Sequence, residues 1–313
     1  MSDNKETKKK VGFFEIIKNI FWLLIFLQFA PIIFANLKRT IDDAISPSTH
    51  VGYLNISGML VDSTFYTKNI QRFLKAPEIK ALVVRLDSPG GLPGSAQAIF
   101  QELSKFKEKK PVVAFIENIG ASAAYNIAIA SNHIIATPSA LVGSIGVWLQ
   151  VPPNIKYLAE DWKVKFRNIQ SGEFKTSGSP FKDMTASEKK HLQEVSDDSY
   201  NQFITDVAKS RNLNVKDHKI WADGKVFTGN QALALKLIDQ TGSFQDAIEK
   251  IKKEAMIETD IKLIKPKRPT GLMKLFGAQD DSESDITFSS FVSTLATQVV
   301  EKLTSKLESP RFR

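Results

Sequence analysis

Between residues 51 and 252, short apolar runs alternate with amphipathic stretches, and this alternation limits the possible folds more than any other feature. The runs typical of strands are 51–56, 81–87, 112–117, 133–138, 145–150 and 163–169. The stretches typical of helices are 66–76, 94–107, 122–131, 186–210, 229–236 and 243–254. Strands that alternate with helices form βαβ units, so the sequence predicts an α/β fold with a mostly parallel sheet.

The composition indicates a globular protein and excludes several kinds of site. Hydrophobic residues make up 42% of the 313 residues, and the net charge is +8. The lysines are scattered and form no basic stripe interleaved with aromatic residues, so we expect no nucleic-acid partner. Cysteine is absent, which excludes disulfides, zinc–thiolate sites and a cysteine nucleophile. We expect neither a metal nor another cofactor.

An apolar run at residues 20–35 predicts a transmembrane helix near the N-terminus. The run is short against the roughly 20 residues that span a bilayer core, although residues 36–37 can extend it. Lysines at 5, 8, 9, 10 and 18 favour a cytoplasmic N-terminus, whereas Lys38 and Arg39 oppose it. A cleaved signal peptide and a buried core helix are the alternatives. The small-residue cleavage pattern is poor, and a core helix fits badly behind a polybasic start, so we predict a single uncleaved anchor.

The chain divides by composition into four parts. We assign a cytoplasmic tail and anchor to 1–39, a polar linker to 40–50, a compact domain to 51–255 and a C-terminal extension to 256–313. Near the start of the extension, the segment "DIKLIKPKRP" at residues 260–269 predicts one last strand that runs into a linker. Apolar residues between 288 and 307 recur at helical spacing. This amphipathic helix could pack on the body, on a membrane or within an assembly, and we favour the assembly.

The first of three motifs that could carry chemistry is "RLDSPGG", residues 85–91. A strand here ends in proline and paired glycines before a helix begins. Gly90 and Gly91 permit backbone conformations that other residues avoid, and N–H groups at a helix entrance can stabilise an oxyanion. A plain strand-to-helix turn is the alternative, and it is the favoured explanation when the motif is considered alone.

The second motif is "GASAAYNIAIAS", residues 120–131, with Ser122 where a strand turns into a helix. This arrangement resembles a nucleophile elbow, although the G-x-S-x-G pattern is not matched. The N–H of Ala123 would then be a second oxyanion donor. The alternative is that Ser122 only caps the helix.

The third motif is "SGEFKTSGSPF", residues 171–181, which places Lys175 in a loop rich in glycine and serine. With only four histidines in the chain, a lysine is the expected proton acceptor for a serine nucleophile. Such a lysine must be neutral, and burial against apolar groups favours the neutral form. Phe174 and Phe181 are the expected source of that burial. A solvated surface lysine is the alternative, and only the combination with the other motifs overturns it.

Taken together, the motifs resemble one family of enzymes. From about Val51 to Lys252 the chain is similar to the signal peptide peptidase A group of membrane-bound serine proteases, in the Clp protease/crotonase-like superfamily. The resemblance rests on five segments in this order: "LDSPGG", "GASAAY", "LVGSIGV", "SGEFKTSGSPF" and "GKVFTGNQALALKLID". It implies repeated ββα units and a peptidase domain over 51–255, located in the bacterial inner membrane with the catalytic domain on the periplasmic side.

The resemblance also implies roles for individual residues. Ser122 would be the nucleophile and Lys175 the general base, with Gly90 or Gly91 and Ala123 forming the oxyanion hole. Ser144 would orient Lys175 or a peptide. Enzymes of this length in the family assemble into homo-oligomeric rings, in which the lysine can come from a neighbouring subunit.

The expected function is therefore endoproteolysis of cleaved signal peptides and other apolar peptides through an acyl-enzyme, in contact with membrane lipid. A crotonase-like acyl-CoA enzyme and a non-catalytic membrane scaffold are the alternatives. The chain departs from the family pattern at Lys225, where arginine is common, and at Lys236, where glycine is common. Both positions lie outside the catalytic motifs, so we expect them to affect packing rather than activity.

Overall fold

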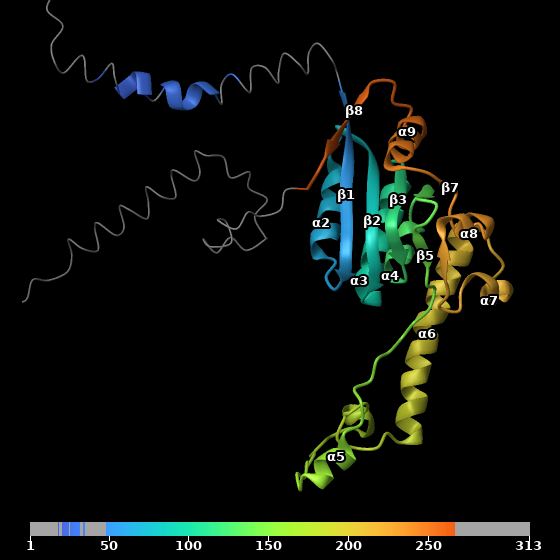
Figure 1. Cartoon of the computed structure of the whole chain (residues 1–313). Coiled ribbons are helices and arrows are strands. Elements are labelled where there is room, and N and C mark those ends of the chain that lie inside the picture. Colours follow the sequence, from blue (N-terminus) through green and yellow to red (C-terminus); the bar gives the residue numbers. More distant parts are fainter. Residues whose placement is uncertain (1–17, 19–20, 25, 32–33, 35–47, 267–313) are drawn as a thin grey trace, which may run out of the picture. The chain divides into compact units, whose positions relative to one another are not determined.

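The computed structural model describes residues 18, 21–24, 26–31, 34 and 48–266. Its centre is a sheet flanked by helices (Figure 1). The strands are β1 (Ser48–Leu60), β2 (Ile79–Gly91), β3 (Val112–Ala121), β4 (His133–Ala136), β5 (Leu141–Gly143), β6 (Val226–Thr228), β7 (Gln240–Thr241) and β8 (Asp260–Ile264). The α-helices are α2 (Thr64–Lys75), α3 (Pro93–Lys107), α4 (Ala123–Ala128), α5 (Lys156–Asp161), α6 (Ala186–Arg211), α7 (His218–Trp221), α8 (Gly229–Ala234) and α9 (Phe244–Glu254). The short 3₁₀ helices are η1 (Glu173–Thr176) and η2 (Val215–Asp217).

Within the described residues the sheet has the strand order β6-β5-β3-β2-β1-β8, and β4 pairs with β3 and β7. Every strand pair is parallel except β5 with β6. The prediction of an α/β fold with a mostly parallel sheet is therefore confirmed. The segment "DIKLI" forms β8, which pairs with the start of β1, so the sheet includes residues on both sides of 51–255.

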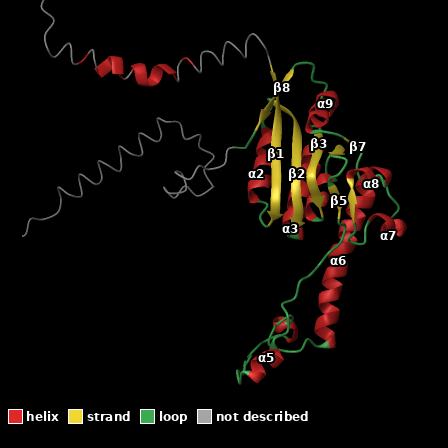
Figure 2. Ribbon diagram, viewed as in Figure 1, coloured by secondary structure: helices red, strands yellow, loops and turns green. Residues whose placement is uncertain are grey.

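Helices flank the sheet (Figure 2), and two separate hydrophobic cores cover its two faces, which explains the continuous apolar runs in its central strands. Alternate residues point to opposite faces. On one face Val83 and Phe115 pack against α9 through Ala247 and Ile251. On the other, the neighbouring strand residues pack against α2, α3 and α4 in a larger cluster.

Two of the predicted strands are wrong. Residues 145–150 and 163–169 form no strand, and they belong to or lead into a segment that lies away from the sheet, at the N-terminal end of α6 (Figure 1). We call residues 148–185 the arm; it contains α5 and η1, neither of which has a buried residue. Trp148, Trp162 and Ile169 are at least 73% exposed. Their apolar character therefore does not come from packing in the core of this chain.

The predicted anchor lies largely outside the described residues. Residues 18, 21–24, 26–31 and 34 are helical. Within the part of the chain that the structure describes, no helix has both the length and the apolar character of a membrane span. The anchor thus stays a prediction. The predicted amphipathic helix between 288 and 307 lies outside the described residues altogether.

Candidate active site

Ser122 stands at the turn between β3 and α4 in a backbone conformation that side chains other than glycine rarely adopt. Its φ is 52° and its ψ is −123°. Such a conformation costs about 1–3 kcal/mol and persists only where the surrounding structure imposes it. The Ser122 side chain makes no capping hydrogen bond to α4. The capping role is therefore wrong, and the hydroxyl is left available for another purpose.

Backbone contacts from three segments hold this turn. The Ser122 N–H donates to the carbonyl of Gly143 at the end of β5, over 2.7 Å. The Ser122 carbonyl accepts the N–H of Asn126 at 3.0 Å, the first bond of α4. On the third side lies Gly90, where an added Cβ would come within 2.9 Å of the Ser122 Cβ. The local fold therefore needs glycine at position 90.

The two glycines of the first motif differ in where their N–H groups point. The Gly90 N–H donates to Ser88 Oγ at 3.2 Å. Gly91 is in register with Leu60 of β1, whose carbonyl instead accepts the N–H of Leu92 at 2.8 Å. Because successive residues of a strand direct their N–H groups to opposite sides, the Gly91 N–H points away from β1, toward the side on which Ser122 lies. Gly91 thus offers the freer donor of the two.

Ser122 lies between two cavities, because it lines both. The smaller has a volume of about 270 Å³ and is lined by the predicted oxyanion residues Gly91 and Ala123, by α3 and by the middle of α6. The larger has a volume of about 570 Å³ and contains Ser144. Ser144 also has a positive φ, 49°, and its N–H donates to the carbonyl of Lys225 at 2.7 Å. The structure therefore brings Ser122, Gly90, Gly91, Ala123 and Ser144 together.

The larger cavity has an acidic and aromatic wall. Its remaining polar and aromatic lining includes Asp197, Asp223, Trp148 and Tyr200. Burial raises the pKa of the Tyr200 phenol, so this group is neutral at physiological pH. The two carboxylates give this side of Ser122 a negative potential, whereas no charged side chain lines the smaller cavity.

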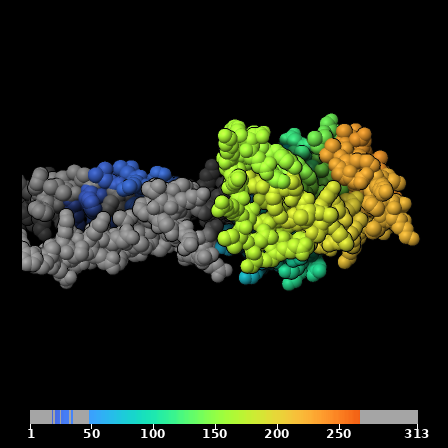
Figure 3. All heavy atoms as spheres, turned by 90° about the horizontal axis from the view of Figure 1, so that it is seen from below, coloured from blue at the N-terminus to red at the C-terminus, as the bar shows by residue number. Residues whose placement is uncertain are grey.

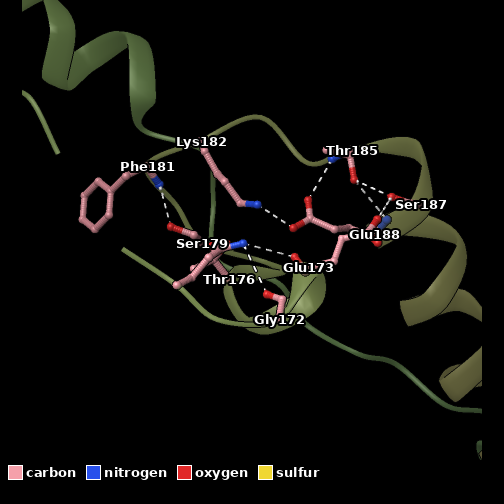
Figure 4. A network of polar contacts seen from close by, with 10 residues as sticks. Gly172, Glu173, Thr176, Ser179, Phe181, Lys182, Thr185, Ser187 and Glu188 are labelled. Atoms are coloured by element: carbon pink, nitrogen blue, oxygen red, sulfur yellow. Dashed lines mark hydrogen bonds and ion pairs between the residues drawn. The ribbon is translucent and has the colours of Figure 1, made fainter. Parts of the chain in front are cut away.

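Lys175 lies in η1 of the arm, and it lines neither cavity. Its position is fixed to the start of α6 by a polar network (Figure 4). Ser187 Oγ donates to the Glu173 carboxylate at 3.0 Å, and Lys182 Nζ donates to the buried Glu188 carboxylate at 2.5 Å. Glu188 also completes a capping box with Thr185.

The length of α6 keeps Lys175 away from Ser122 of the same chain. Ser187, beside η1, and Phe203, which lines the smaller cavity, are 16 residues apart on this helix. At 1.5 Å per residue this is about 24 Å along the helix axis between these two residues. Since Lys175 lines neither of the cavities that contain Ser122, the structure does not bring the predicted nucleophile and base together within one chain.

The expected burial of Lys175 is also wrong for the single chain. Lys175 is exposed. Phe181 stacks on Phe166 with ring centroids 3.7 Å apart, and Phe174 lies 5.0 Å from the ring of His191. Figure 3, which looks onto the arm, shows the yellow-green atoms of this segment spread across the surface. Phe181 and Phe174 thus pack on these other rings, and the Lys175 side chain stays exposed.

The sequence did not indicate the part of the site that comes from α6 and from the interior of α4. Ser199, Gln202 and Phe203 reach the smaller cavity from a helix about 80 residues further along the chain. Asn126 lies four residues after Ser122, hence on the same face of α4. That spacing was the available signal for Asn126, whereas no local pattern pointed to α6.

Comparison with known proteins relates the chain to a family of peptidases. The family model "Peptidase family S49" matches residues 104–258, which include Ser122, Ser144 and Lys175. A "Putative protease" of Synechocystis is 40% identical over 200 residues, covering 63% of this chain and 71% of that protein. A "Putative signal peptide peptidase SppA" of Enterococcus faecium is 33% identical over 247 residues, covering 74% and 71%. "Protease 4" of Salmonella typhi is 33% identical over 179 residues, covering 56% and 28%. The chain belongs to peptidase family S49.

Proposed function

We propose that this protein is a serine endopeptidase in which Ser122 is the nucleophile. The observation that carries the proposal is the conformation of Ser122: a strained backbone, with an uncapped hydroxyl at the wall shared by two cavities. A serine held this way at a strand-to-helix turn is presented to a substrate rather than to its own helix. Membership of a peptidase family makes a peptide the expected substrate, instead of an acyl-CoA thioester.

The oxyanion hole in this proposal consists of the N–H groups of Gly91 and Ala123. Both residues line the smaller cavity beside Ser122, and Ala123 directly follows the nucleophile. Gly90 has another role, because its N–H is bound to Ser88 and its lack of a side chain makes room for Ser122. Two fixed backbone donors would stabilise the negative charge that develops on the attacked carbonyl oxygen.

The general base is Lys175 of a neighbouring copy. The position of Lys175 supports transfer between subunits, because the lysine of the same chain is exposed and lines neither cavity that contains Ser122. The arm also exposes a large apolar surface that includes Trp148, Trp162 and Ile169, which is typical of a surface that another protein covers. A head-to-tail contact of this kind, in which each arm docks beside the next Ser122, closes into a ring. Docking would bury Lys175 and so favour its neutral form.

The reaction follows from these positions. Ser122 Oγ attacks the peptide carbonyl carbon, and its proton passes to Lys175 Nζ of the neighbour. The tetrahedral intermediate collapses with cleavage of the C–N bond, and the same ammonium group protonates the leaving amine. Water, deprotonated by the neutral lysine, then attacks the acyl-enzyme and releases the acid. Ser144, in the larger cavity with Ser122, would hold the lysine Nζ in line.

The location and substrates rest on the sequence. The apolar run 20–35 behind a basic N-terminus would anchor the chain as a single span in the bacterial inner membrane, with the peptidase domain outside the cytoplasm. Extended, apolar peptides close to the lipid surface, such as cleaved signal peptides, are the substrates that fit this location. The Enterococcus relative is named as a putative signal peptide peptidase, which agrees with this substrate class.

The test is hydrolysis of a fluorogenic apolar peptide by the full chain in detergent. Ser122→Ala and Lys175→Ala should each lower kcat/KM by at least about 10³-fold, whereas Lys165→Ala, a change at an exposed lysine of the same arm, should have little effect. A fluorophosphonate probe should label wild type at Ser122 and leave Ser122→Ala unlabelled. Persistent activity of either catalytic variant would contradict the dyad. A wild-type protein without hydrolysis or labelling would favour the scaffold or acyl-CoA alternatives.

A further inference from the structure

Asn126 is a buried polar residue whose side chain has no protein partner. It is only 5% exposed, and it lies in α4 four residues after Ser122. Its backbone N–H donates to the Ser122 carbonyl, but within the described residues no hydrogen bond engages its side-chain amide. An amide has two donors and two acceptor positions, so this side chain can bind a polar partner that enters the cavity it lines.

The amide belongs to the smaller cavity beside Ser122. Two other amide side chains line this cavity, but both already have partners: Gln202 donates to Asp198 at 2.7 Å, and Gln97 to Asp206 at 3.4 Å. Among these three amides, Asn126 is therefore the one whose side chain has no hydrogen-bond partner within the described residues. A polar group of this kind on a cavity wall can select what the cavity accepts.

The size and chemistry of the cavity limit the ligand to one neutral side chain. Its volume of about 270 Å³ is at the lower end for ligand sites and too small for several residues of a peptide. Its lining consists of small residues, Phe203 and uncharged polar residues, and none of its lining side chains is charged. A charged side chain would therefore be desolvated there without a counter-charge, which is unfavourable.

We propose that Asn126 determines specificity: its amide hydrogen-bonds a neutral polar side chain, such as threonine or glutamine, on the substrate residue whose carbonyl Ser122 attacks. The inference rests on the proposed function. If the carbonyl oxygen binds between the N–H groups of Gly91 and Ala123, the side chain of the same residue is next to the cavity that those two groups line. The enzyme would then cleave apolar peptides after an embedded polar residue, and it would disfavour the aliphatic residue of equal size.

The test compares pairs of fluorogenic peptides that differ only at this residue: threonine against valine, and glutamine against leucine. Wild type should prefer the polar member of each pair by about tenfold in kcat/KM, the value expected for one hydrogen bond. Asn126→Leu and Asn126→Ala should remove or reverse the preference, and Asn126→Gln should restore part of it. Asn230→Leu, at an exposed asparagine of α8, is the matched control and should keep the preference.

Fluorophosphonate labelling of Ser122 shows whether a negative result contradicts the role of Asn126 in specificity or the proposed peptidase function itself. A variant that labels at the wild-type rate is folded and has an intact nucleophile, so its preference is interpretable. Equal cleavage of both members of each pair by wild type, or an unchanged preference in folded Asn126→Ala, would overturn the inference and leave water as the partner of the amide. Absence of cleavage and labelling in wild type would refute the proposed function instead, and the inference with it.

Discussion

Gly90 and Ser122 are in direct contact at the point where β2 and β3 end. An added Cβ on Gly90 would lie 2.9 Å from the Ser122 Cβ and 3.0 Å from the Ala121 carbonyl oxygen, and the φ of Gly90 is +114°. Both the contact and the backbone conformation require glycine here. The paired-glycine motif thus shapes the backbone around Ser122, in addition to containing Gly91, the proposed oxyanion donor.

Gly90→Ala should therefore destabilise the protein by more than about 2 kcal/mol and abolish peptide hydrolysis, since the turn around Ser122 must move. Gly94→Ala is the matched control for stability, because nothing lies within 4 Å of its added Cβ and it begins a helix. That change should leave the free energy of unfolding unchanged or raise it by up to about 1 kcal/mol. Urea unfolding of both variants measures this. Equal stabilities would contradict the close contact.

The strain at Ser122 predicts that activity and stability oppose each other at this residue. Ser122→Gly and Ser122→Ala should both be inactive, but only glycine relieves the φ of 52°. Ser122→Gly should therefore be more stable than Ser122→Ala by about 1 kcal/mol. Thermal and urea unfolding of the two variants give the difference. If Ser122→Ala were as stable as Ser122→Gly, the strain would not exist in solution.

The backbone at Lys236 explains why glycine is common at this position in the family pattern. Its φ is 60°, and it lies two residues after the end of α8, where a left-handed residue commonly ends a helix and glycine is preferred. Lys236→Gly should raise the free energy of unfolding by about 1 kcal/mol, since its exposed side chain loses no packing. Activity should not change, because this residue lines neither cavity. A destabilised Lys236→Gly would show that the lysine side chain contributes more than its backbone strain costs.

The pair Arg211–Asp239 and the neighbouring His133 predict loss of stability in acid. Burial lowers the pKa of His133. Burial acts to raise the pKa of Asp239, but the Arg211 guanidinium outweighs it and holds that pKa below its usual value. A lowered folded-state pKa means that stability is present above the unfolded-state pKa and is lost as pH falls. Stability should therefore fall below about pH 6.5 because of His133, and again below about pH 4 because of Asp239.

Two variants separate these contributions in unfolding experiments from pH 7 to pH 3. His133→Gln should flatten the loss between pH 6.5 and 5. Arg211→Met should cost about 1 kcal/mol at pH 7, because it removes the two-point contact of 2.8 and 3.0 Å and leaves the partly exposed Asp239 carboxylate without this partner. A pH dependence that His133→Gln does not alter would contradict the assignment to this histidine.

The sequence predicted the sheet well because its signals are local. The runs 51–56, 81–87, 112–117 and 133–138 are strands, each buried on both faces. Residues 148–150 and 163–169 have similar composition, but this chain leaves them exposed, whereas Ile145 is buried in the core. Apolar patterning reports that a segment avoids water, and it does not distinguish a core of the same chain from a surface that a second copy covers.

The candidate site was predicted only in part, because only some of its residues are close together in the sequence. The turn that holds Ser122 follows from adjacent residues, and the structure brings it to Gly91, Ala123 and Ser144. Sequence order could not show that the intervening arm places Lys175 outside both cavities that contain Ser122. The polar wall of the smaller cavity depends on long-range packing of α6 against α4, which no local pattern encodes.

The central claim, that Ser122 of one copy works with Lys175 of another, is tested most directly by co-expression of Ser122→Ala with Lys175→Ala. Each variant is expected to be inactive alone. In a randomly mixed ring, half of the subunits keep Ser122 and half of their relevant neighbours keep Lys175, so hydrolysis should return to about a quarter of the wild-type rate. Activity that stays absent in the mixed assembly, with both variants folded and co-purifying, would contradict the account.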